Sequence, residues 1–173
     1  MDQLSFQLLV MVCILTHVVR SVYEVLKYKK ILEPTRLTFV IVFANMGILW
    51  MSWVLVCSHD SLRISFPAVI HYFGALLAVA GIILFFVALF TIKSLESYDG
   101  DLITKGIYSK LRHPMYTAFT LWLIGFPVFY GGIYSFFLTL LFGANILFWR
   151  YLEEKELVKR FPSYRDYQKT TLF

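Results

Sequence analysis

Several windows of this 173-residue chain are almost free of charged side chains over about 20 residues, the length that a bilayer-spanning helix needs. In lipid, every backbone N–H and C=O must be satisfied within the segment, which a helix does. The apolar segments are Leu4–Lys27, Leu37–Cys57, Ala68–Ile92, Pro114–Tyr130 and one from Ile133 that continues to Phe161. The pattern predicts an all-α, polytopic membrane protein with about five transmembrane helices.

We expect residues 1–173 to form a single membrane domain, with three helices over 1–92, then a polar loop, a helical hairpin and a tail over 93–173. The composition fits, because 59% of the residues are hydrophobic. The net charge of +5 is explained by the membrane, and we expect no nucleic-acid partner. Cys13 and Cys57 lie in apolar segments and have no metal-binding or disulfide spacing, so they are expected to be small hydrophobic side chains.

The distribution of basic residues predicts the orientation. All but two of the 16 Lys and Arg residues lie after the first span, after the third span, or at the end of the chain. Because basic residues collect on the cytoplasmic side, we expect the N-terminus outside and the C-terminus in the cytoplasm. The two exceptions are Arg63, in the second loop, and Arg20, within the first span.

Polar side chains gather at the ends of the last two apolar segments. Pro114 is suited to the first position of a helix, so the free N–H groups of that helix would face the polar loop and favour an anion. Arg112 adds a planar guanidinium, whereas Glu153 and Glu154 suit an ammonium, ribose hydroxyls or the neighbourhood of a sulfonium. The tight Gly131-Gly132 turn should bring the His113 and Glu153 ends level.

Structural roles also fit some of these residues individually. A purely structural role as the cap of its helix would explain His113. Arg150 stands three and four residues before Glu153 and Glu154, which is the spacing of an ion pair within one helix.

The combined pattern resembles the isoprenylcysteine carboxyl methyltransferase family, within the wider group of phospholipid-methyltransferase-like membrane proteins. The pattern is Gly-x-Tyr-x-x-x-Arg-His-Pro-x-Tyr, a short hairpin, and Glu-Glu-x-x-Leu-x-x-x-Phe-x-x-Tyr-x-x-Tyr. The matching residues are Gly106, Tyr108, Arg112, His113, Pro114, Tyr116, Glu153, Glu154, Leu157, Phe161, Tyr164 and Tyr167. The resemblance covers about 100–167, and the first three spans match only in being hydrophobic.

The resemblance implies methyl transfer from S-adenosylmethionine at the cytoplasmic membrane face, to a lipophilic acceptor that enters from the bilayer. It implies an acceptor-binding arginine one turn before the glutamate. Trp149 holds the usual position, and Arg150 is the candidate here. The implied cofactor-binding residues are Gly100, Asp101, Leu102, Ile103, Tyr108, Arg112, His113, Pro114, Met115, Tyr116, Glu153 and Glu154.

We assign no catalytic base and expect no metal, because a positioned sulfonium methyl needs mainly orientation and a dry pocket. Two other functions remain open at this point. One is a membrane enone or sterol-type reductase that uses NADPH. The other is a non-enzymatic membrane module in which the polar cluster only caps helices.

Overall fold

The computed structural model describes residues 3–33, 35–92 and 102–173. Within these ranges the chain forms six α-helices and one short 3-10 helix, η1, and no β-strand, which confirms the all-α prediction. The elements are α1 (Gln3–Tyr28), α2 (Arg36–Ser58), α3 (Ala68–Ile92), η1 (Gly106–Ser109), α4 (Pro114–Tyr130), α5 (Ile133–Arg160) and α6 (Tyr164–Thr170).

Four of these helices, α1, α2, α3 and α5, are long and apolar enough to cross a membrane. Their ends lie within one or two residues of the bounds that the apolar windows predict. The expected fourth span forms as helix α4 but has only 17 residues. The count of five spans and the orientation in the membrane stay predictions. Neither η1 nor α6 was expected from the apolar windows.

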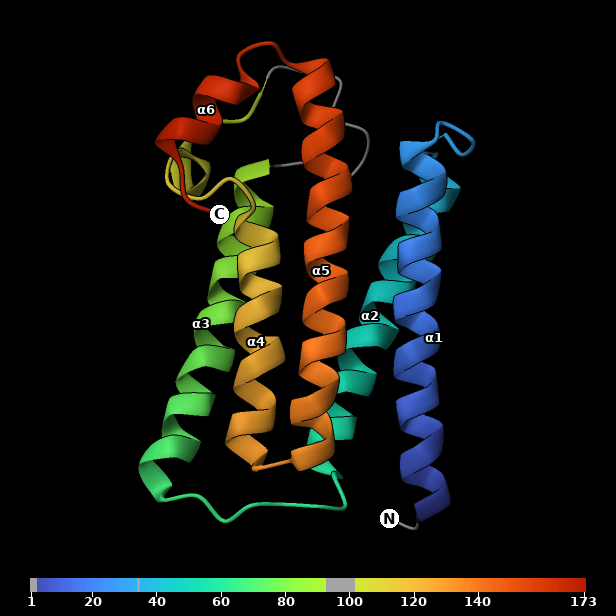
Figure 1. Ribbon diagram of the computed structural model, residues 1–173, viewed down its shortest axis with the longest axis vertical. Helices are drawn as coiled ribbons and strands as arrows, with labels where there is room; N and C mark the ends of the chain where they lie inside the picture. The colour runs from blue at the N-terminus through green and yellow to red at the C-terminus, as the bar shows by residue number, and fades with distance from the viewer. Residues whose placement is uncertain (1–2, 34, 93–101) are drawn as a thin grey trace.

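The last two long helices stand side by side and antiparallel (Figure 1). Helix α3 runs along α4 on one side of this pair, and α2 and α1 lie on the other side. The ends of α1, α3 and α5 and the beginnings of α2 and α4 lie at the same end of the molecule, where α6 also lies. The polar cluster, which comprises Arg112, His113, Glu153 and Glu154, lies at this end.

A residue of the α2–α3 loop, Asp60, holds the turn between α4 and α5 in place. Gly131 has a φ of 69°, the left-handed conformation that glycine adopts without strain. The backbone N–H and hydroxyl of Ser135 both donate to Asp60 Oδ2, at 2.7 and 2.9 Å. Through these hydrogen bonds the buried carboxylate of Asp60 caps the first turn of α5 and joins the hairpin to the end of α2.

Small residues let α3 and α4 approach closely. A Cβ atom built on Gly125 would lie 2.6 Å from the backbone nitrogen of Ala78, and one on Gly81 would lie 2.8 Å from the carbonyl of Ala118. Glycine and alanine at such contacts are typical of helices that pack in membranes.

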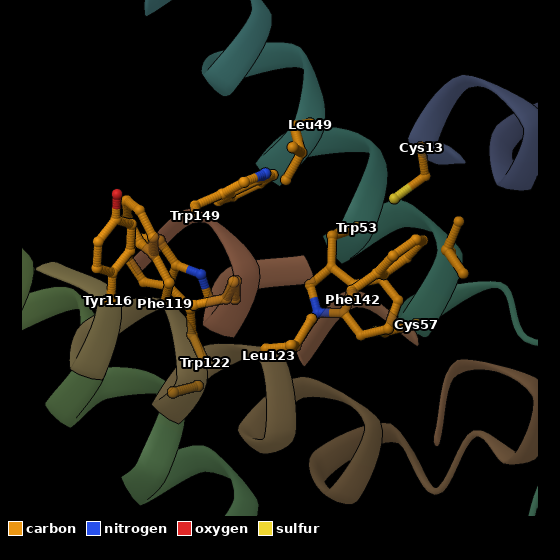
Figure 2. Packing of buried hydrophobic residues seen from close by; sticks show 13 residues of the cluster. Cys13, Leu49, Trp53, Cys57, Tyr116, Phe119, Trp122, Leu123, Phe142 and Trp149 are labelled. Carbon is orange, nitrogen blue, oxygen red and sulfur yellow. The ribbon is translucent and has the colours of Figure 1, made fainter. Parts of the chain in front are cut away.

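Buried side chains of α2, α4 and α5 make up most of the core, and about half of the buried core residues are aromatic (Figure 2). Trp50 and Trp122 meet edge to face with ring centroids 4.8 Å apart. Cys13 and Cys57 are free and fully buried, which confirms their predicted role as small apolar side chains. Tyr116 lies at the edge of the cluster, with its hydroxyl directed away from the other labelled rings (Figure 2). This edge adjoins the polar cluster.

Candidate active site

Helix α4 begins at Pro114, as predicted, and His113 is its N-cap residue. The imidazole of His113 is only 4% exposed and makes no capping hydrogen bond to the first turn. Its Nε2 atom lies 3.2 Å from Glu154 Oε1 and 3.3 Å from the Tyr164 hydroxyl. The side chain of His113 therefore points across to α5 and α6 and joins three segments.

The carboxylate of Glu154 contacts two arginines, Arg112 and Arg150, and the imidazole of His113. Its Oε1 atom lies 3.4 Å from Arg112 Nε, 3.2 Å from His113 Nε2 and 3.3 Å from Arg150 Nη2. The contact with Arg150 is the ion pair within one helix that the sequence spacing allowed. These contacts bring the beginning of α4 level with the end of α5, as the short turn predicted. Glu154 thus cross-links the two helices by charge.

Glu153 has a different environment from its neighbour. Its side chain is 38% exposed, against 21% for Glu154. Among the described residues, its ion-pair contact is with His113 Nδ1 at 3.9 Å, which is too long for a hydrogen bond. The hydroxyl of the buried Tyr116 faces its carboxylate. Among the described residues Glu153 thus has no Lys or Arg within ion-pair distance, although Lys27 of α1 lies within electrostatic range of its carboxylate.

The C-terminal segment closes one side of the cluster. Arg112 donates through Nη1 to the carbonyls of Gln168 and Thr171, at 2.9 and 2.6 Å. The backbone N–H groups of Arg112 and His113 donate to the carbonyls of Leu172 and Phe173, at 3.0 and 3.2 Å. The N–H of His113, just before the first turn of α4, is thus satisfied by the chain itself.

Tyrosine hydroxyls connect α6 and η1 to the same site. The Tyr167 hydroxyl donates to the carbonyl of Tyr108. Burial raises the pKa of Tyr108, Tyr164 and Tyr167, so all three stay protonated at neutral pH. Tyr164 and Tyr167 were not predicted as site residues. The signal for them was their place in the repeated Tyr spacing at the end of the motif.

The remaining predicted site residues lie either outside the described residues, beside η1 and the start of α4, or in the charge network of Glu154. Gly100 and Asp101 fall outside the described residues. Leu102 and Ile103 are half-buried before η1, and Pro114 and Met115 begin α4. Arg150, the predicted acceptor ligand, pairs with Glu154, and its guanidinium lies 4.2 Å from the ring centroid of Phe173. Arg150 therefore belongs to the same charge network as Arg112.

A second pair of charges lies on α1 and was not predicted as part of a site. Arg20 Nη2 contacts Glu24 Oε1 at 2.5 Å, and the two side chains are 15% and 7% exposed. The guanidinium of Arg20 also lies 5.6 Å from the ring centroid of Trp149. The signal in the sequence was two opposite charges one helical turn apart in an otherwise apolar span.

The model of the phospholipid methyltransferase family matches residues 69–164, which include α3, η1, α4 and α5 and end at the first residue of α6. The chain belongs to this family. It is also 35% identical over 85 residues to a protein-S-isoprenylcysteine O-methyltransferase from Schizosaccharomyces pombe. This similarity covers 45% of the chain and 34% of that relative, so the chain aligns with only about a third of the relative's length. No solved structure matches the chain. Helices α1 and α2 lie outside the matched range.

Proposed function

We propose that this protein is a membrane methyltransferase that uses S-adenosylmethionine and acts on a lipophilic acceptor. Family membership supports methyl transfer as the reaction class. The relative from S. pombe supports a prenylated cysteine as one acceptor to test. The observation that carries the proposal is the contrast between Glu154, which forms ion pairs with Arg112 and Arg150, and Glu153, whose one ion-pair contact among the described residues is the 3.9 Å approach of His113.

The residues of the cluster fit this cofactor by their chemistry. Glu153 would accept hydrogen bonds from ribose hydroxyls, or would face the positive charge of the sulfonium. Tyr116 and Tyr108, both buried and protonated, would line the ligand with aromatic surface and hydroxyl donors. The bound cofactor supplies a methyl group on a positively charged sulfur, which makes that carbon electrophilic.

The other residues of the site keep this arrangement in place. Glu154 holds the N-terminus of α4 against α5, and the tail covers the side of Arg112 and His113. Because the side chain of Glu154 is engaged in three contacts, we assign it a positioning role in place of direct cofactor binding. Arg150 shares this role through its ion pair. A closed, apolar surrounding would exclude water, which favours transfer to the acceptor over hydrolysis.

The direct test is binding of S-adenosylhomocysteine to the detergent-purified protein by isothermal titration calorimetry. We expect binding by the wild-type chain and a loss of about tenfold or more in Glu153→Gln, since hydrogen bonds to a charged group are typically strong. NADPH is titrated in parallel, because binding of NADPH in place of S-adenosylhomocysteine would favour the reductase alternative. No binding of S-adenosylhomocysteine at millimolar concentration would refute the proposal.

A further inference from the structure

The ion pair on α1 does not join this helix to its neighbours. Arg20 and Glu24 stand one turn apart on the same helix, so their contact adds nothing between helices. The hydrogen bonds from α1 to α5 are made by other residues. Ser21 Oγ donates to Asn145 Oδ1 at 2.8 Å, and Trp149 Nε1 donates to Ser21 Oγ at 2.9 Å. Ser21, Asn145 and Trp149 thus join α1 to α5 without the ion pair, and the guanidinium of Arg20 adds a contact 5.6 Å from the ring centroid of Trp149.

Charges within a membrane-spanning helix are costly, and they usually mark a functional site. Both residues are mostly buried, on a helix long and apolar enough to cross the membrane. The Nε atom of Arg20 is buried and has no hydrogen-bond partner. Glu24 thus satisfies only part of the guanidinium, which has five N–H donors in a planar fork.

The position of Arg20 places it beside the candidate cofactor site. Its guanidinium lies near the ring of Trp149, one helical turn before Glu153 on α5. Tyr116, whose hydroxyl faces Glu153, lies within electrostatic range of both Arg20 and Glu24. A ligand group held by Arg20 would therefore lie on the membrane side of Glu153, between α1 and α5.

We propose that Arg20 is an acceptor-binding residue, which holds an anionic group of a lipid-borne acceptor, a carboxylate or a phosphate, next to the methyl donor. This inference rests on the proposed function. The anion would share the guanidinium with Glu24 or replace it. It would reach the site from the bilayer along α1, so that an apolar tail stays in lipid while its charged end meets Arg20.

For a carboxylate acceptor, the charge change of the reaction also favours release. A carboxylate oxygen forms a bond to the methyl carbon, the carbon–sulfur bond breaks, and its electron pair goes to sulfur. The sulfonium becomes a neutral thioether, the carboxylate becomes a neutral ester, and no proton moves. The ester no longer attracts Arg20, which can then pair fully with Glu24 again.

The experiment compares the wild-type chain with the double variant Arg20→Gln/Glu24→Gln, which removes both charges of the ion pair together. The probe is N-acetyl-S-prenylcysteine, added to the detergent-purified protein with S-adenosylhomocysteine present. We expect its Kd to rise about tenfold or more in the double variant, because a charge-assisted contact is lost. The uncharged carboxamide of the same probe should bind both proteins equally. Lys29→Gln, which removes an exposed cation just after the end of α1, is the matched control and should bind the probe like wild type.

A second arm identifies the source of the anion. Mixed micelles that contain phosphatidylethanolamine replace the prenylated probe, and a loss of binding confined to this arm would assign a headgroup phosphate to Arg20. Equal binding of both acceptors by the wild type and the double variant would overturn the inference, as would an equal loss in Lys29→Gln. Binding of S-adenosylhomocysteine is measured on every variant. Its absence in the wild type refutes the proposed function, whereas unchanged acceptor binding in the double variant refutes only the role of Arg20.

Discussion

Two adjacent glutamates on α5 should respond to the same substitution in opposite ways. Glu154→Gln keeps the shape of the side chain but removes the charge that Arg112, His113 and Arg150 contact at 3.2–3.4 Å. Glu153→Gln removes a charge that is 38% exposed, that faces the Tyr116 hydroxyl, and whose ion-pair contact among the described residues is with His113 at 3.9 Å. We therefore expect the first change to lower stability with a smaller effect on ligand binding, and the second to weaken binding with little effect on stability.

The magnitude follows from the contacts of Glu154. A hydrogen bond to a charged group contributes about 1.5–3 kcal/mol, roughly twice the contribution of a neutral one. Losing the charge weakens three such contacts, but the long distances and the partial exposure of the side chain reduce the effect. We expect a loss of about 1–3 kcal/mol in the free energy of unfolding. In a chain of this length, that corresponds to a decrease in melting temperature on the order of 2–12 °C.

The assay is thermal unfolding of the purified protein in one detergent, followed by intrinsic tryptophan fluorescence, with calorimetric binding of S-adenosylhomocysteine on the same samples. Asp166→Asn is the control, because its ion pair with Lys169 is fully exposed and should leave the melting temperature unchanged. If Glu153→Gln lowered the melting temperature as much as Glu154→Gln, the division between a ligand-binding and a structural glutamate would be wrong. A normal melting temperature in Glu154→Gln would also contradict it.

Three further substitutions and one control test how the fold holds the site, each by melting temperature in the same detergent. Gly125→Ala should destabilise by about 1–3 kcal/mol, because its Cβ would lie 2.6 Å from the α3 backbone, whereas Gly47→Ala, with open space around it, should be neutral or stabilising; equal effects would contradict the close approach. Asp60→Ala should cost about 1–3 kcal/mol, because the buried backbone N–H of Ser135 loses its acceptor; no loss of stability would mean that Asp60 does not hold the hairpin. Tyr164→Phe should cost about 0.5–1.5 kcal/mol, and no loss would mean that its hydroxyl contact with the imidazole contributes nothing.

The apolar windows predicted the long helices well because each window carries its own signal. A helix in lipid satisfies its backbone internally, so length and composition decide it with little help from tertiary contacts. The beginning of α4 was also predictable, since Pro114 fixes it locally. The short helix α6 was not, because it is polar and its position depends on contacts of Tyr164 and Tyr167 with residues more than 50 positions away.

The division of roles between Glu153 and Glu154 could not be predicted from the sequence. Both residues follow Arg150 at spacings that allow an ion pair, and both match the family pattern. The choice depends on which carboxylate the start of α4 faces, and this is set by the rotation of α5 in its packing against α4. In the structure, Arg112 and His113 face Glu154, so Glu153 is left toward Tyr116 and α1.

Under the proposed function, the same rotation would decide which side of the site an acceptor reaches. With Glu154 turned toward the loop and the tail, Arg150 is drawn into that network and away from the lipid-facing side. The cation that remains beside Trp149 is Arg20, contributed by a helix that lies outside the range matched by the family model. If the matched helices supply the methyl-donor half of the site, then α1 supplies a surface that can differ between family members. Acceptor preference would then be encoded where the family pattern ends, which the binding of charged and uncharged probes to the Arg20 variants measures directly.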